Sequence, residues 1–524
     1  MAKLLSEATK RVFTPETLRS AAKQSEGCLV VSVRLRRAIK RYLKELEEPH
    51  MKKKVLRLSQ SFSEIKDANS MLSANTSKEL VEDPFKSMES SQRWKIRSAY
   101  GDIGLTYSDS ETVAYVASRM PAVFSACFRV LNEVGKRLPD FSPAKVLDFG
   151  AGTGSAFWAM KEVWPKSIKK VNLVEPSQSM QRAGRSLIQG LKDLPLIHGY
   201  DSIQGLSKNL KKTEREHDLV IASYVLGEIP SMKDRITIVR QLWDLTRDVL
   251  VLIEPGTPHG SNIISQMRSH ILWMEKRKLR KSQKKSSETC SDLVPVNNGV
   301  FIVAPCSHEG RCPLEKSGKY CHFVQRLQRT TSQRVYKSSK GGGPLRGFED
   351  EKFSFVAFRR GQRPRDTWPL SGVKLESLKE QRANRSSAEV LEIDYDEYAE
   401  QHEYEEEDDD DVDDGKHKGA DRINYDSDFS ETDNIEDDNE EGQEQEEMVK
   451  TDAAETSEAD LGGGWGRIIF SPVRRGKHVT LDVCRSVNEE STEGSYERIV
   501  VTKSKNPTLH HQARKSLWGD LWPF

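Results

Sequence analysis

The chain has 524 residues, of which 36% are hydrophobic and 31% charged, so more than one domain and a sizeable core are expected. No apolar run approaches the roughly 20 residues of a membrane-spanning helix, so no such helix is expected. The formal net charge of +1 hides a segregation of charge, because acidic residues crowd between positions 392 and 460 and leave a basic remainder. A basic body with an acidic tether is compatible with nucleic-acid binding.

The N-terminal region, residues 1–99, is predicted to be helical and basic, with its densest amphipathic stretch at 33–43. The first residues lack the long apolar stretch of a secretory signal. Arginines such as Arg11 and Arg19 would suit a mitochondrial transit peptide, but Glu7 and Glu16 leave that signal ambiguous.

Strands and helices then alternate. Helical periodicity over 112–138, interrupted at Pro121, is followed by short apolar strands and by a helix over 232–246. The predicted strands lie at residues 145–149, 171–175, 219–223, 249–253 and 353–358. This alternation predicts an α/β fold with a Rossmann-like parallel sheet covered by helices on both faces.

A glycine loop follows the first of these strands and opens a helix. Its glycines permit a tight turn and a close backbone approach to a ligand, and Glu175 at the end of the next strand can accept the hydroxyls of a ribose. The Asp-x-Gly-x-Gly-x-Gly layout resembles the first motif of class I S-adenosylmethionine-dependent methyltransferases. The predicted cofactor-binding residues are Asp148, Gly150, Ala151, Gly152, Thr153, Gly154, Glu175, Ser223 and Tyr224.

The segment that would carry methyl-transfer chemistry has no recognisable catalytic motif. Residues 222–228 contain neither the cysteine of RNA 5-methylpyrimidine enzymes nor the Asn/Asp-Pro-Pro-aromatic turn of amino-methylating enzymes. Tyr224 and Glu228 are expected to line the pocket, no residue is marked as a general base, and the catalytic residues stay unassigned.

Three cysteines, Cys306, Cys312 and Cys321, lie close together after a basic helix over 274–281. Such spacing in a large chain favours a metal or iron–sulfur site over a disulfide framework. The spacing lacks the Cys-x2-Cys pairs of a zinc ribbon, and Cys312-Pro313 is similar to the Cys-Pro of bacterial ferredoxins, so a [4Fe–4S] cluster is favoured over zinc. The favoured fourth ligand is Cys484, with Cys290 the second choice and His308 or His322 open for zinc.

The remaining chain divides by composition. The methyltransferase-like domain is assigned to residues 100–362, with a cysteine insert at 288–330, and an acidic disordered insert to 363–464. Strand-like pieces at 467–470, 479–484 and 498–501 predict a small antiparallel β meander within 465–524, followed by a basic tail. A cluster that included Cys484 would fasten this meander to the cysteine insert.

Several segments together resemble the methyltransferase-like proteins of the mitochondrial ribosomal small subunit. They are residues 119–122, 148–154, 223–228, 254–260, 304–306 with 312–314, 477–484, and the Trp-Gly-Asp terminus at 513–523. The resemblance implies a mitochondrial matrix protein with an S-adenosylmethionine pocket and a [4Fe–4S] cluster on Cys306, Cys312, Cys321 and Cys484.

The implied function is an assembly factor or component of the mitochondrial small ribosomal subunit that contacts its rRNA and proteins, with no membrane or DNA partner. The alternative is an active S-adenosylmethionine-dependent rRNA methyltransferase. Basic stretches are the expected RNA contacts, namely Lys276, Arg277, Lys278, Arg280, Lys281, Lys284, Lys285, Lys503, Lys505, Arg514 and Lys515.

Overall fold

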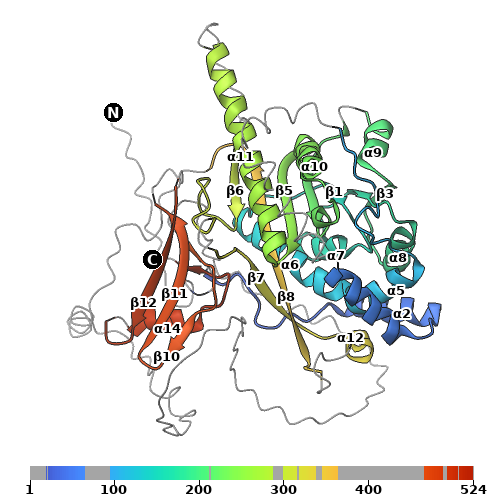
Figure 1. Ribbon diagram of the computed structural model, residues 1–524, viewed down its shortest axis with the longest axis horizontal. Coiled ribbons are helices and arrows are strands. Elements are labelled where there is room, and N and C mark those ends of the chain that lie inside the picture. The colour runs from blue at the N-terminus through green and yellow to red at the C-terminus, as the bar shows by residue number, and fades with distance from the viewer. Residues whose placement is uncertain are drawn as a thin grey trace, which may run out of the picture.

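The computed structural model describes residues 19, 22–64, 95–211, 214–286, 299–315, 318–337, 345–363, 465–487, 493–505 and 507–522. An α/β body and a smaller β-rich unit beside it make up the described chain (Figure 1). All but the first residue of the predicted acidic insert 363–464 lies outside the described residues, as does Cys290.

The body is built on one large sheet. In the described part of the chain its strand order is β3-β2-β1-β4-β5-β8-β6, with β7 also paired to β8. Strands β1 to β5 run parallel, whereas β8 runs antiparallel to β5. This order, with one antiparallel strand next to the last, is that of class I methyltransferases, so the predicted fold class is confirmed. The strands are β1 (Lys145–Phe149), β2 (Lys170–Val174), β3 (Leu196–Tyr200), β4 (His217–Ser223), β5 (Thr246–Pro255), β6 (Val300–Ala304), β7 (Phe323–Gln328) and β8 (Phe348–Arg360).

Side chains of this sheet alternate between two hydrophobic cores. Val146, Ile221 and Val251 face the helices α6 and α7, whereas Leu147 and Leu250 face α10 and α11. The body helices are α2 (Val33–Leu46), α5 (Asp109–Ser118), α6 (Met120–Arg137), α7 (Ser155–Val163), α8 (Gln178–Ile188), α9 (Ile203–Asn209), η3 (Leu226–Glu228), α10 (Met232–Asp244), α11 (Pro258–Ser286) and α12 (Thr331–Tyr336). A further helix covers residues 51–64.

The helical pattern predicted over 112–138 forms two helices. Helix α5 ends before Arg119, and Pro121 lies in the first turn of α6, where its missing N–H costs nothing. The basic helix predicted at 274–281 is the distal part of α11, which starts at Pro258 and projects beyond the body (Figure 1). No helix in the described ranges is long and apolar enough to cross a bilayer.

The C-terminal unit is an antiparallel sheet, as predicted. Its described strands are β9 (Gly466–Ile468), β10 (Val473–Arg475), β11 (His478–Ser486), β12 (Gly494–Thr502) and β13 (Leu521–Trp522), and helix α14 (Pro507–Lys515) packs on β11 and β12. The central strand is β11, which pairs with β9, β10 and β12, so β9 does not pair with its neighbour in sequence.

Several contacts among the described residues hold the C-terminal unit on the body, and two of them involve buried carboxylates. The carboxylate of Asp520 accepts hydrogen bonds from the backbone N–H groups of Gln24 (2.9 Å) and Ser25 (3.2 Å). Arg467 of β9 forms an ion pair with Glu133 of α6, and both side chains are buried. The start of the described chain and helix α6 of the body are thus both in contact with the C-terminal unit.

Candidate cofactor pocket and cysteine cavity

A cavity of about 790 Å³ opens at the carboxyl ends of the parallel strands. Ligands of open α/β sheets bind at this edge. Five of the predicted cofactor residues line it: Gly150, Gly152, Glu175, Ser223 and Tyr224. Asp148, Ala151 and Thr153 are buried beside it, and Gly154 caps α7.

The loop at Gly150 cannot accept a side chain. Its φ is +71°, and an added Cβ would lie 2.6 Å from the Cβ of Val225. The backbone N–H of Gly152 donates to Oε2 of Glu175 and that of Ser177 donates to Oε1, each at 2.8 Å. Each carboxylate oxygen keeps a lone pair for a further donor, so Glu175 is fixed in a position to bind hydroxyl groups.

Carboxyl groups line this cavity together with two cationic side chains, those of Arg119 and Lys337, and a larger number of hydroxyl groups. Burial raises the pKa of Glu228 to about 8 even though Tyr107 donates to it at 2.8 Å. Burial also raises the pKa of Glu254 to about 7, while its oxygens accept from the N–H groups of Leu226 (2.8 Å) and Gly227 (3.1 Å). Since Arg119 and Lys337 are themselves paired with Glu351 and Glu349, the carboxyl groups of the lining would favour a ligand that carries positive charge.

Tyr224 occupies a strained position, with φ +57°, and its hydroxyl is already engaged. The hydroxyl donates to Glu351 at 2.7 Å, and the same carboxylate binds Arg119 through two contacts of 2.6 and 2.7 Å. Burial, and then Glu351, raises the pKa of Tyr224 well above 10, so the phenol is a poor proton acceptor near neutral pH. Glu351 carried no sequence signal, because it lies far along the chain in β8.

Asp148 is fully buried, and neither carboxylate oxygen has a hydrogen-bond partner among the described residues. Burial, and then Glu175, raises its pKa to about 7. Asp148 lies in β1, directly before the glycine loop, and is not among the described residues that line the cavity.

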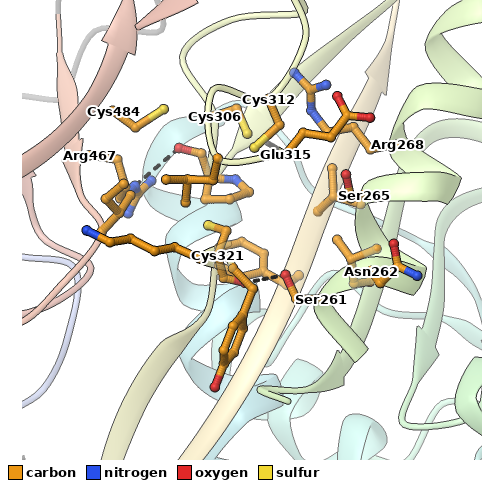
Figure 2. Close-up of a pocket in the computed structure, with 18 of the residues that line it drawn as sticks. Ser261, Asn262, Ser265, Arg268, Cys306, Cys312, Glu315, Cys321, Arg467 and Cys484 are labelled. Atoms are coloured by element: carbon orange, nitrogen blue, oxygen red, sulfur yellow. Dashed lines mark hydrogen bonds between the residues drawn. The ribbon is translucent and has the colours of Figure 1, made fainter. Parts of the chain in front are cut away.

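The second site is a cavity of about 400 Å³ between the body and the C-terminal sheet. It is lined by all four predicted metal ligands, Cys306, Cys312, Cys321 and Cys484, and Figure 2 shows their side chains around it. Cys306 and Cys312 lie in the loop after β6, Cys321 precedes β7, and Cys484 lies in β11. The structure thus brings together residues from segments on either side of the acidic insert.

The four thiols are near enough to influence one another. Burial, and then Cys306, Cys312 and Cys484, raises the pKa of Cys321 well above that of free cysteine. Among the described residues, however, no three His, Cys, Asp or Glu side chains are grouped tightly enough to hold a single metal ion. The four cysteines line the cavity from three separate segments of the chain.

Two buried arginines fix the loop that carries Cys306 and Cys312. Arg268 of α11 donates to the carbonyls of His308 (2.9 Å) and Gly310 (2.8 Å), and Arg467 donates to that of Pro305 (3.2 Å). Both guanidinium groups also line the cavity (Figure 2). No sequence pattern indicated these roles, because buried arginines have the same local pattern as surface ones.

Around this cavity positive charge outnumbers negative charge. Glu133 is in contact with three buried arginines, Arg129, Arg137 and Arg467, and Arg268 is buried on the opposite wall. Asp520 is a further buried carboxylate near Arg129, and Glu315, which is half-exposed, lines the cavity itself. An excess of buried positive charge favours an anionic occupant of the cavity.

Comparison with known proteins gives a family match over most of the chain. The model of a family described as mitochondrial small ribosomal subunit Rsm22 matches residues 109–374 and 424–523. These segments include the sheet of the body, the cysteine segment and all the described strands of the C-terminal sheet.

Curated relatives show the same likeness. The chain is 31% identical over 269 residues to the human mitochondrial ribosome assembly protein METTL17, which covers 51% of this chain and 52% of that protein. It is 22% identical over 477 residues to the mitochondrial ribosome assembly protein RSM22 of Saccharomyces cerevisiae, which covers 79% of this chain and 67% of that protein. The match thus spans about half the length of the human relative.

Among solved structures, a putative RNA methyltransferase from Pyrococcus horikoshii is similar with a TM-score of 0.24 and 15% identity, over 45% of this chain and 81% of that one. The strand order of the large sheet identifies the fold of the body.

Proposed function

The chain belongs to the mitochondrial small ribosomal subunit Rsm22 family, and from that premise we propose that it is an assembly factor or component of the mitochondrial small ribosomal subunit that binds rRNA. The mitochondrial location expected from the sequence is confirmed by the family and by the names of the relatives, and a matrix location is part of the proposal. The observation that carries the proposal is the family match, which includes both the body and the C-terminal sheet.

The proposed RNA contact is the distal part of α11. Lys276, Lys278, Arg280 and Lys281 are exposed there, on a helix that extends away from the body (Figure 1). Lysine and arginine neutralise phosphates and release counterions, so such a helix suits an rRNA backbone. The exposed Lys503, Lys505, Arg514 and Lys515 would add to this contact.

We expect the triple variant Lys276→Glu, Arg280→Glu, Lys281→Glu to bind small-subunit rRNA at least about tenfold more weakly at 0.1 M salt. The slope of log affinity against log salt should become shallower by roughly 0.7 to 0.9 for each phosphate that the variant no longer neutralises. Filter binding measures both quantities. On a sucrose gradient of mitochondrial lysate, the wild type should co-migrate with small-subunit particles or their precursors, and the variant should shift towards the top.

The matched control is the triple variant Lys52→Glu, Lys53→Glu, Arg57→Glu. These exposed residues lie on the helix over 51–64, and the change in charge is the same. Equal loss of binding in both variants would remove α11 as the contact. A wild-type protein that never co-migrates with small-subunit particles would end the proposal itself.

S-adenosylmethionine is the proposed ligand of the 790 Å³ cavity. The anchored carboxylate of Glu175 would accept the ribose hydroxyls, and Glu228 and Glu254 would face the positive charge of the ligand. When bound, this molecule supplies an activated methyl group. The engaged hydroxyl of Tyr224 gives no base for its transfer, whereas Glu228, with a pKa of about 8, is the feature that favours the alternative of an active rRNA methyltransferase.

Gly150→Ala should abolish S-adenosylmethionine binding in calorimetry, because its Cβ would overlap Val225 at 2.6 Å. Gly27→Ala is the control, since nothing lies within 4 Å of its added Cβ. Mapping of rRNA methylation in cells with Gly150→Ala then separates the two functions. A lost methyl mark supports the enzyme, and intact marks support the assembly role.

The proposed occupant of the cysteine cavity is a [4Fe–4S] cluster held by Cys306, Cys312, Cys321 and Cys484. A zinc site requires all four ligands about 2.0–2.3 Å from one ion. Four cysteines around a space of about 400 Å³ suit the larger cluster, which takes four thiolates. The excess of buried arginine also suits a thiolate-bound cluster, which carries net negative charge.

A further inference from the structure

His308 lies between two of the proposed cluster ligands in sequence and next to a third in space. It belongs to the loop from Cys306 to Cys312, and its side chain is 0% exposed. Its Nε2 lies 3.6 Å from Sγ of Cys484 on strand β11. The ring therefore joins the cysteine loop of the body to the cysteine of the C-terminal sheet.

The packing fixes this ring in place. A Cβ added to Gly494, the first residue of β12, would lie 2.2 Å from the ring atoms Cε1 and Nε2 of His308. Arg268 also donates to the backbone carbonyl of His308 at 2.9 Å. Because a side chain at position 494 would displace the ring, Gly494 is part of what holds Nε2 against Cys484.

When Cys484 binds a metal, the hydrogen bond between His308 and Cys484 can have only one direction. A thiolate has no hydrogen to give, so the hydrogen in this contact must lie on Nε2. Hydrogen bonds to ligating sulfurs are among the factors that set the reduction potential of iron–sulfur clusters. Donation withdraws negative charge from the sulfur and so stabilises the reduced cluster.

We propose that His308 donates a hydrogen bond from Nε2 to Sγ of Cys484, and so positions this ligand and raises the reduction potential of the cluster. The inference rests on the proposed [4Fe–4S] centre and adds a residue that the metal set does not include. His308 acts here through Cys484 and is a positioning residue. The alternative, in which the ring is itself a zinc ligand, makes a different prediction for the metal content.

The test is a redox titration with dithionite, followed by electron paramagnetic resonance, on full-length protein purified without oxygen. We expect His308→Ala to keep its iron and sulfide and to show a lower midpoint potential than the wild type. His308→Gln should restore at least half of the shift, because its amide group can also donate. Loss of the metal in His308→Ala, or a potential equal to that of the wild type, would overturn the inference.

A second pair of variants tests the same contact without changing His308. Gly494→Ala should displace the ring and lower the midpoint potential in the same direction. Gly476 lies in the turn between β10 and β11 of the same sheet, with nothing within 4 Å of an added Cβ, so Gly476→Ala should leave the potential unchanged. Equal potentials for the two glycine variants would contradict the role of His308.

Failure of the cluster and failure of this inference give different results. A wild-type protein without iron and sulfide would refute the proposed centre and, with it, the role of His308. A wild-type protein with the cluster and variants with unchanged potentials would refute the role of His308 alone.

Discussion

Replacement of Cys484 by serine is expected to remove most of the iron and sulfide from protein purified without oxygen. Cys484 is the one proposed ligand that comes from the C-terminal sheet, where it pairs with Arg467 of β9 and Tyr496 of β12. The other three thiols lie in the body. A cluster bound to all four would therefore hold the sheet on the body by coordination as well as by packing.

Because metal-binding free energy contributes to folding, loss of the cluster should also weaken this attachment. We expect the thermal midpoint of Cys484→Ser to fall by about 5–10 °C, the equivalent of a few kcal/mol. Amide hydrogen exchange should rise in residues 465–487 more than in β1 or β4. The wild type and the variant should be purified and supplied with iron and sulfide in the same way before these measurements.

Cys28→Ser is the control, because Cys28 is an exposed thiol outside the cavity. It should retain the iron and the thermal midpoint of the wild type. Equal iron and sulfide in Cys484→Ser and the wild type would remove Cys484 from the ligand set, and with it the coordination between body and sheet.

The sequence was most informative where a local pattern reports a local structure. The apolar run at 145–149 and the glycines after it predicted strand β1 and its loop as the structure has them. Strand β3 was not predicted, because Leu196–Tyr200 is an edge strand with a half-exposed, mixed pattern. Strands β6 and β7 were not predicted either, because they are short and flank a segment whose prolines, glycines and cysteines indicate irregular backbone.

The residues of the two sites could likewise be predicted only where the sequence around them carries a recognisable pattern. Cys484 was predicted to join the other cysteines because a zinc or iron–sulfur site normally has four ligands. In the structure it lines the same cavity as the other three. Arg268, Arg467 and Glu351 were not predicted. Each acts through a partner that is far away in the chain, so only the folded arrangement distinguishes them from ordinary surface charges.

Glu133→Gln is expected to destabilise the protein by about 3–5 kcal/mol in urea unfolding at pH 7, because it leaves buried arginines without their counter-charge. Glu133 is 0% exposed on its side chain and accepts from Arg129 at 2.9 Å and Arg137 at 3.3 Å, besides the ion pair with Arg467. The control is Glu45→Gln, since Glu45 is exposed and its pair with Arg41 spans 3.8 Å. An exposed pair of this kind contributes at most about 1 kcal/mol.

The acid dependence of stability gives a second measurement of the same group. Burial alone would raise the pKa of Glu133, but Arg467, Arg129 and Arg137 outweigh it and hold the pKa at about 2, below the ordinary 4.5. A carboxyl whose pKa is lowered by folding stabilises the protein above its unfolded pKa and loses that contribution as the pH falls towards the folded value. The contribution at neutral pH is about 3 kcal/mol from a shift of this size.

The difference in unfolding free energy between the wild type and Glu133→Gln should therefore be constant from pH 7 to about 5 and should shrink as the pH falls towards about 2. A difference that stays constant over the acid range would show that Glu133 is not the charged partner of the arginines. Since Arg467 also lines the cysteine cavity and holds the carbonyl of Pro305, the same variant should lower the iron content as well as the stability. If Glu133→Gln lowers the stability but leaves the iron content unchanged, the cluster does not depend on the ion pairs of Glu133. The ion pairs and the cluster would then stabilise the attachment of the C-terminal sheet independently.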